Sequence, residues 1–263
     1  MKTVTVQAVG ICAAGLPDWP SASRVLAGSA DFELDTPPKG PLEGLPQTER
    51  RRINETSRLA CLAASEALAA LGSGVSRTIP AIFTSADGDG VVLTQLLSSL
   101  AQREVVVSPT AFHNSVYNAP AGYWTIASRS TAPCTTVCAD SSSFAVALLE
   151  GYVQAITTGA SVLVVAADVP FPEALRALGR STAAFACALV LTGAPAGIGA
   201  SIEGWRIGDG SGRSRGSVEI SAIYGDNAAA AALPLLRALA SGGDENIALP
   251  YLDGAWLELE VVA

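Results

Sequence analysis

Histidine is almost missing from this sequence: its 263 residues include one, His113. A serine nucleophile needs a nearby base to remove its proton, and histidine is the usual base. Any serine and histidine chemistry in this chain therefore depends on a single residue. Long apolar runs are missing as well, since nowhere do about 18 apolar residues follow one another, as a bilayer crossing requires. The sequence predicts no membrane span, and we expect a soluble protein.

An excess of positive charge is also lacking. Lysine and arginine number 16 against 24 aspartates and glutamates, which gives a formal net charge of −8 and a pI near 4.7. Phosphate backbones and anionic membranes would repel such a protein at long range. Nucleic acid is therefore not an expected partner.

Cysteine is scarce and shows no pairing pattern. The five cysteines, Cys12, Cys61, Cys134, Cys138 and Cys187, are odd in number, far apart and set in apolar runs. Buried, reduced thiols explain them better than disulfides or a metal site. We therefore expect a cytoplasmic protein without a bound metal or cofactor.

Apolar strands alternate with amphipathic helices along the chain. Strand patterns cover residues 3–12, 81–85, 135–139 and 161–167, and helical patterns cover 53–71, 91–100, 117–128 and 143–158. The segment 161–167 is apolar throughout, which indicates a strand buried on both faces by helices. The alternation is typical of an α/β fold. The chain is long enough for one sizeable core, and we expect a single domain over residues 1–263.

The stretch CTTVCADSSSFAVALLEG, residues 134–151, reads as a strand, a hydroxyl-rich corner and a helix. A residue at this corner lies in the first turn of the helix, where free N–H groups and the helix dipole stabilise an oxyanion. Ser141 is therefore a candidate nucleophile, with His113 as its base. The alternative is that Asp140, Ser141 or Ser142 caps the helix, and the spacing alone favours this interpretation.

The order of residues around this corner resembles the central part of β-ketoacyl-acyl carrier protein synthases. The shared elements are Ser108 and Pro109, Asn118 followed by Ala121 and Gly122, then Pro133, the corner, and Gly159 and Ala160 before a buried strand. The resemblance is strongest over residues 51–208, and residues 209–263 form a C-terminal extension. It implies a thiolase-like half-fold, a mixed five-stranded sheet covered by helices on both faces.

Two departures from the family decide what the resemblance implies. The nucleophilic cysteine of the family falls on Ser141 when counted from Asn118, and on Ser142 when counted back from Gly159. The family also carries two histidines and a lysine in the second half of its fold, whereas this chain has neither residue type after residue 208. The resemblance therefore implies a degenerate site in which no catalytic residue is expected.

Ketosynthase-like proteins without a nucleophile include the short chain-length-factor subunits of aryl polyene biosynthesis, which this sequence resembles. In that group the inactive subunit pairs with an active, full-length ketosynthase and shapes its acyl pocket. The resemblance implies a heterodimer of this kind, with an acyl carrier protein and its acyl chain as a further partner. Two alternatives stay open: a serine acyltransferase or hydrolase using Ser141 and His113, and a free-standing acyl-binding or scaffold protein.

Residues near the corner are candidates for the pocket or the interface. They are Phe112, His113, Asn118, Tyr123, Trp124, Asp140 and Phe144. Large aromatic side chains are good anchors at interfaces and good floors for apolar tunnels. Core packing is the alternative, and burial within a helix explains Trp124 particularly well. Phe112 and His113 are the better tunnel candidates, because we expect the segment after Pro109 to be irregular.

Overall fold

The computed structural model contains one eight-stranded sheet in the order β3-β2-β4-β5-β1-β6-β8-β7. The structure describes residues 3–40, 42–72, 77–178, 181–194, 199–211 and 218–262. The strands are β1 (Val4–Ile11), β2 (Ala81–Thr84), β3 (Cys134–Val137), β4 (Ser161–Asp168), β5 (Phe185–Thr192), β6 (Ser201–Gly208), β7 (Glu245–Pro250) and β8 (Trp256–Val262). Because β2 runs parallel to β3 and β4 while the other neighbours are antiparallel, the sheet is mixed, as predicted.

The predicted number of five strands is wrong. Five strands from β3 to β1 are present in one block, but β6 pairs with the free edge of β1, and β8 and β7 extend the sheet further. The junction consists of Val4 opposite Ile202 and Thr5 opposite Ser201. An open edge on β1 would leave backbone N–H and C=O groups without partners, and β6 supplies partners at the start of this strand.

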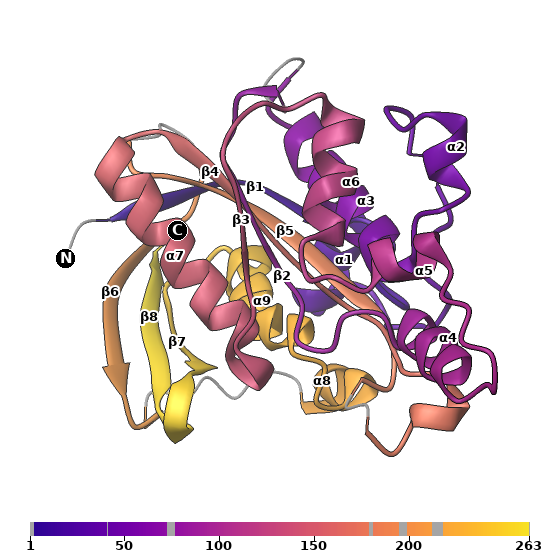
Figure 1. Cartoon of the computed structure of the whole chain (residues 1–263). Coiled ribbons are helices and arrows are strands. Elements are labelled where there is room, and N and C mark those ends of the chain that lie inside the picture. The colour runs from indigo at the N-terminus through magenta and orange to yellow at the C-terminus, as the bar shows by residue number, and fades with distance from the viewer. Residues whose placement is uncertain are drawn as a thin grey trace.

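Helices cover both faces of the five-stranded block, as predicted (Figure 1). Helices α3 (Glu55–Ala69) and α6 (Ala119–Ser128) pack on one face, and α7 (Ser143–Thr158) packs on the other. The strand β5 is buried at every position, and β4 is buried at every position except Ser161. This burial explains why both strands are apolar throughout.

The three C-terminal strands have a helix on one face only within the described residues. Leu257 and Leu259 are buried in the same core as α9 (Leu233–Ser241), whereas Arg206, Asn246 and Glu260 are exposed. Helical cover on both faces is therefore limited to the five-stranded block. Polar residues alternate with apolar ones along β6 to β8, so one face of these strands stays in water.

A helix occupies the segment after Pro109, which corrects the expectation of an irregular structure there. The remaining α-helices of the described residues are α1 (Trp19–Leu26), α2 (Gln47–Arg50), α4 (Gly90–Leu100), α5 (Pro109–Asn114) and α8 (Val218–Tyr224). In α5, Ser108 Oγ accepts the amide hydrogen of Ala111 at 3.3 Å, and Pro109 occupies the first turn, where its missing N–H does no harm.

All five cysteines are free thiols. Cys12, Cys61 and Cys187 are buried, and burial raises the pKa of each thiol to about 12. Cys134 is half-buried and Cys138 is exposed, so the prediction of buried thiols is wrong for Cys138. Across the part of the chain that the structure describes, no helix has both the length and the apolar character needed to cross a membrane.

Candidate functional site: a strand-to-helix corner and the apolar face beside it

The corner between β3 and α7 is closed by Ser143. Its hydroxyl Oγ accepts the amide hydrogen of Ala139 at 3.0 Å and donates to the carbonyl oxygen of Asp140 at 2.6 Å. Ser142 occupies the N-cap position of α7, but its side chain makes no capping hydrogen bond. The spacing predicted Asp140, Ser141 or Ser142 as the helix cap. The hydroxyl that closes the corner belongs instead to Ser143.

The two serines predicted at the nucleophile position have different environments. Asp140 has a φ of 54°, in the left-handed region that aspartate tolerates better than most residues. After this turn Ser141 is exposed and Ser142 is buried. Ser141 borders two hollows of about 560 and 360 Å³, and Trp256 of β8 lines both. Of the two hydroxyl groups, that of Ser141 is the accessible one.

The single histidine is not bonded to that hydroxyl. His113 lies in α5 with its ring edge-on to Tyr123 at a centroid distance of 5.8 Å. Within the described residues, neither the Ser141 hydroxyl nor the His113 imidazole makes a hydrogen bond. The hollows beside Ser141 are lined by the corner and the C-terminal segment, whereas α5 borders a different cavity. The geometry therefore does not assemble the predicted pair.

Three of the candidate aromatic residues belong to the core. Tyr123 is 1% exposed, its Oη donates to Asn114 Oδ1 at 2.9 Å, and Asn114 Nδ2 donates to the carbonyl oxygen of Arg52 at 2.6 Å. Burial is the main cause that raises the pKa of the Tyr123 phenol. Trp124 and Phe144 are buried as well. These rings support the site from inside the molecule.

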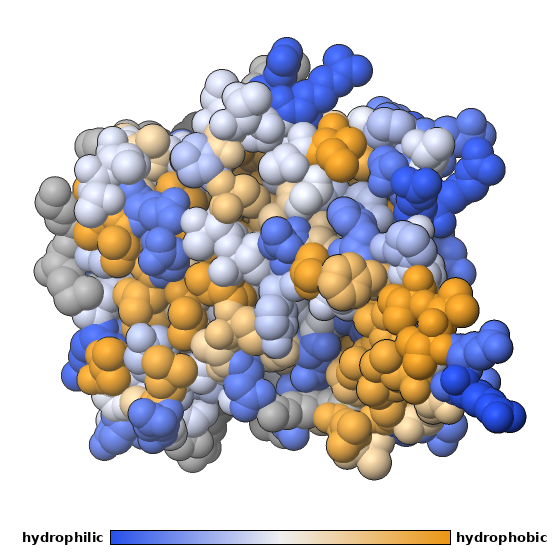
Figure 2. Space-filling model, viewed as in Figure 1, coloured by the Kyte–Doolittle hydropathy of each residue, from blue (hydrophilic) through white to orange (hydrophobic). Residues whose placement is uncertain are grey.

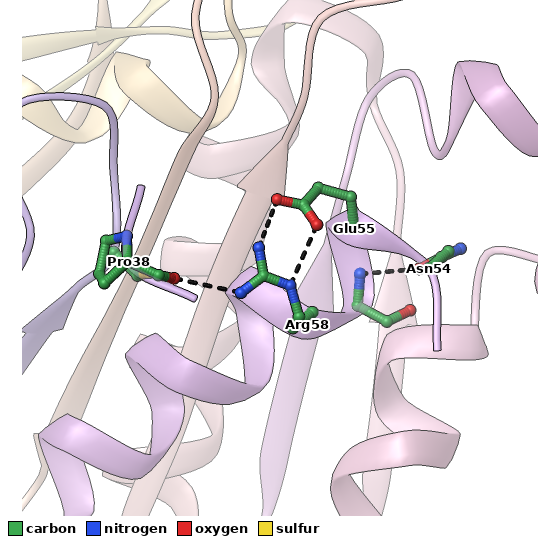
Figure 3. Close-up of polar contacts among 6 residues, drawn as sticks. Pro38, Asn54, Glu55 and Arg58 are labelled. Atoms are coloured by element: carbon green, nitrogen blue, oxygen red, sulfur yellow. Dashed lines mark hydrogen bonds and ion pairs between the residues drawn. The ribbon is translucent and has the colours of Figure 1, made fainter. Parts of the chain in front are cut away.

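The first turn of α3 holds neighbouring loops in place. Asn54 caps the helix through its side chain and also donates from Nδ2 to the carbonyl oxygen of Asn114 at 3.2 Å. Figure 3 shows the Arg58 guanidinium bound to both carboxylate oxygens of Glu55 and to the carbonyl oxygen of Pro38, the latter at 3.1 Å. These contacts tie the segment around residue 38 and the end of α5 to α3.

An apolar face lies on α4, on α5 and on the segments that follow these two helices. We define it by its exposed side chains, which are Val91, Leu93, Leu97, Leu100, Val105, Val106, Val107, Phe112, Val116 and Tyr117. Figure 2 shows a broad hydrophobic area over α4, at the lower right of the view. Within α4 only Gly90 and Val92 are buried.

The exposure of α4 was not predicted, although the sequence contains a signal for it. Residues 90–100 include no charged side chain, and six of the eleven residues are valine or leucine. A helix with a wide apolar side normally buries that side against something. Since the chain itself leaves α4 largely uncovered, this helix has the character of a contact surface.

A cavity of about 240 Å³ separates the apolar face from the first turn of α3. Its walls combine the apolar Leu93 and Val116 with Ser85, Asp87 and Tyr117. The Tyr117 phenol lies near the thiol of Cys138, whose negative charge is the main cause that raises the pKa of Tyr117. The apolar face therefore approaches the corner at Tyr117 and Cys138.

Strand β3 forms the edge of the sheet next to the corner. It pairs with β2 on one side, and its four residues are half-buried. No strand of the described residues pairs with its other side. The unpaired backbone groups of an edge strand are a ready template for a second chain.

The remaining candidate residues are exposed. Phe112, His113 and Asn118 lie on or beside the apolar face, and Asp140 lies at the corner. No group of three or more histidine, cysteine, aspartate or glutamate side chains in the described ranges is arranged to hold a metal ion. The site thus consists of a hydroxyl-bearing corner, a half-polar cavity and a large apolar face.

Comparison with models of protein families identifies the family to which the chain belongs. A family model of the β-ketoacyl synthase N-terminal domain matches residues 19–221. The chain therefore belongs to the β-ketoacyl synthase family through this domain. The comparison with curated proteins found no match.

Solved structures with the same fold include three ketosynthase assemblies. The chain is similar to a chain of the ketosynthase ApeO in complex with its chain length factor ApeC from Xenorhabdus doucetiae, with a TM-score of 0.72, 22% identity and 99% of each chain covered. It is similar to the ishigamide ketosynthase/chain length factor, with a TM-score of 0.76, 15% identity and coverage of 99% of this chain and 100% of that chain.

The third assembly is AntDE:AntF, a type II PKS acyl-carrier protein in complex with its ketosynthase bound to the hexaketide. It has a TM-score of 0.73, 14% identity and coverage of 100% of this chain and 99% of that chain. These similarities show the thiolase-like ketosynthase fold that the sequence resemblance implied.

Proposed function

We propose that this chain is a non-catalytic ketosynthase-like subunit of the chain-length-factor type, which pairs with an active β-ketoacyl synthase. The uncovered helix α4 is the observation that carries the proposal. Leu97 and Leu100 on this helix are 47% and 58% exposed, and they continue into the exposed valines 105–107. A contiguous apolar patch of this kind on a folded protein marks an interaction site.

The corner supports the non-catalytic part of the proposal. Ser141 or Ser142 stands where the family has its nucleophilic cysteine. A serine hydroxyl is protonated near neutrality and attacks a thioester only with the help of a base. No hydrogen bond joins Ser141 to His113 in the described residues, so no observation favours the alternative acyltransferase or hydrolase.

An active, full-length ketosynthase is the partner that we propose. The apolar face approaches the edge of the sheet where Tyr117 lies near Cys138, the residue after β3, so one partner surface would cover both. The similar structures are ketosynthases with chain length factors, which supports this choice. The carrier protein in the third similar structure supports an acyl carrier protein as a further partner.

The subunit would act by shaping the acyl pocket of its partner. Phe112 is 64% exposed on the apolar face, and Val116 and Tyr117 line the adjoining cavity. Bulky side chains at these positions would limit the space left for a growing acyl chain. The resemblance of residues 112–127 to aryl polyene subunits favours polyketide or fatty-acid-like biosynthesis of the aryl polyene type, carried out in the cytoplasm.

Coexpression with a full-length ketosynthase from the same organism tests the proposal. We expect a stable complex, and we expect the double variant Ser141→Ala and Ser142→Ala to leave product formation intact. Replacing the nucleophilic cysteine of the partner should abolish product formation and serves as the control. Loss of product in the serine variant, with the complex preserved, would show that this chain contributes catalysis of its own.

A further inference from the structure

Asp168 is a buried carboxylate at the end of β4 that joins two segments far apart in the sequence. Its Oδ1 accepts hydrogen bonds from Ser85 Oγ at 2.7 Å, from the amide of Ala86 at 2.9 Å and from the amide of Asp87 at 3.2 Å. Its Oδ2 accepts the amide hydrogen of Ala229 at 3.2 Å. One side chain thus holds both the turn between β2 and α4 and the segment that leads into α9.

The side chains of Ser85 and Asn227 also hold the same two segments in their conformations through hydrogen bonds. Asn227 Nδ2 donates to the backbone carbonyl of Asp168 at 3.1 Å, and Asn227 Oδ1 accepts the amide hydrogen of Ala230 at 3.0 Å. In the turn, Ser85 Oγ accepts the amide hydrogen of Gly88 at 2.9 Å. Each segment is therefore folded around a group that is bonded to Asp168.

These segments border different surfaces. The turn lines the cavity of about 240 Å³ beside the apolar face and leads directly into α4. Residues 225–228 line the hollow of about 560 Å³ beside Ser141. The carboxylate of Asp168 lies between these two surfaces.

We propose that Asp168 is a positioning residue that couples the C-terminal segment to the turn supporting the apolar face. If the amide of Ala229 moves away, Oδ2 is left buried without a donor, which is costly for a charged group. Turning the carboxylate so that Oδ2 reaches water draws Oδ1 away from its three donors, Ser85 Oγ and the amides of Ala86 and Asp87, and so opens the turn as well. The turn and the C-terminal segment therefore stay closed together or open together. The proposal rests on the proposed function only for the identity of the apolar face as the partner surface.

The charge of the carboxylate makes this coupling sensitive to pH. Burial raises the pKa of Asp168 to about 6, against the opposing effect of its hydrogen bonds. The charged groups of the packed segments are Asp87 and Asp89 in the turn and Asp226 in the C-terminal segment, and all carry the same sign. Opening hydrates Asp168 and returns its pKa toward the ordinary value. Ionisation therefore favours opening, and the closed arrangement weakens as the pH rises through about 6.

Hydrogen–deuterium exchange on the full chain tests the coupling. The variant Asp168→Asn is compared with wild type at about pH 5, where Asp168 of the folded wild type keeps its proton and the substitution changes the hydrogen bonds without changing the charge. Exchange is measured in peptides that cover residues 85–92 and 227–233, with residues 57–68 of α3 as an internal reference. We expect exchange in the first two peptides to rise together by roughly tenfold, the effect of losing about 1.4 kcal/mol of hydrogen bonding, while the reference stays unchanged. The control Asp31→Asn makes the same change at an exposed carboxylate outside both segments and should leave all three peptides unchanged. A change in one of the two peptides alone, or in neither, overturns the proposal.

If Asp168→Asn fails to fold, a pH series on the wild-type chain tests the coupling of the two segments instead. Exchange is followed from about pH 5 to about pH 8 and corrected for the intrinsic rate at each pH. We expect protection in both peptides to fall as the pH rises and to level off at one common pH near 6. Flat protection, or levelling off at two separate pH values, overturns the proposal. Because these measurements use the isolated chain, their failure is distinct from failure of the proposed function, which would appear as the absence of a complex.

Discussion

Tyr123 Oη donates a 2.9 Å hydrogen bond to Asn114 Oδ1, and this bond joins α6 to the end of α5. Asn114 extends the connection to the carbonyl oxygen of Arg52. Since α5 also carries the exposed Phe112, a buried pair sets the position of a side chain on the apolar face. The core and the proposed partner surface are therefore linked by a specific bond.

Replacing Tyr123 by phenylalanine tests this bond. The variant Tyr123→Phe leaves Asn114 Oδ1 buried without its donor, so we expect the free energy of unfolding to fall by roughly 1–2 kcal/mol. Urea denaturation measures the change. Tyr251→Phe is the matched control, because the hydroxyl of the half-buried Tyr251 has no hydrogen bond in the described residues. Equal losses in the two variants would contradict the account.

Replacing either of two helical glycines by alanine should change the stability of the protein, but in opposite directions. A Cβ at Gly151 in α7 would lie 2.4 Å from Val164 Cγ2 of β4, whereas a Cβ at Gly122 in α6 would meet nothing within 4 Å. Neither has a positive φ. We expect Gly122→Ala to stabilise the protein by up to about 1 kcal/mol through helix propensity, and Gly151→Ala to destabilise it by about 1–3 kcal/mol through overpacking. Thermal unfolding of both variants checks the signs. If the unfolding temperature shifted in the same direction in both variants, the close packing of Gly151 against Val164 would not have the expected effect.

The pH dependence of stability follows from Asp168. Burial raises its pKa from 3.8 to about 6 in the folded protein. The folded state therefore keeps the proton longer than the unfolded state, and the stability contributed by protonation is lost as the pH rises through about 6. We expect a loss on the order of 2–3 kcal/mol between about pH 4 and about pH 6, measured by urea denaturation at each pH. The variant Asp168→Asn should not show this pH-dependent loss of stability. If the stability of variant and wild type changed in parallel with pH, the attribution to Asp168 would be wrong.

The acyl-pocket role predicts an effect of Phe112 on product length. Phe112→Ala removes an exposed ring, so we expect a stability change within about 0.5 kcal/mol. Together with the active ketosynthase, the variant should shift products toward longer acyl chains, as mass spectrometry of the products would show. Ile207→Ala is the matched control, because Ile207 is 62% exposed on β6 and lies outside the apolar face. An unchanged product distribution would remove Phe112 from the proposed pocket.

Much of the fold was predictable because local patterns and tertiary packing agree. Helix α7 occupies the predicted residues 143–158, and Gly159 ends it with a left-handed φ. Strand β4 is apolar because helices cover both of its faces. In these elements the burial pattern is strong enough to define the element without knowledge of its neighbours.

Other features depend on contacts between distant segments, which local patterns do not reveal. The strands β6 to β8 alternate polar and apolar residues, and nothing in that pattern shows that they join the free edge of β1. The Asp168 network joins residues 85–87 to residue 229 and depends wholly on tertiary structure. Helix α5 is different, because Ser108 before Pro109 is a readable helix start that the expectation of an irregular segment overlooked.

The central claim is that the apolar face binds an active ketosynthase, and the mass of the complex tests it most directly. The double variant Leu97→Glu and Leu100→Glu places two charges on the face, and Gln95→Glu with Ser98→Glu places the same charges at exposed polar positions of α4. Native mass spectrometry is performed after coexpression with the ketosynthase. We predict a heterodimer for wild type and for the polar-position control, and separate subunits for the leucine variant with an unchanged circular dichroism spectrum. A heterodimer that persists in the leucine variant, or no heterodimer with wild type, would contradict the claim.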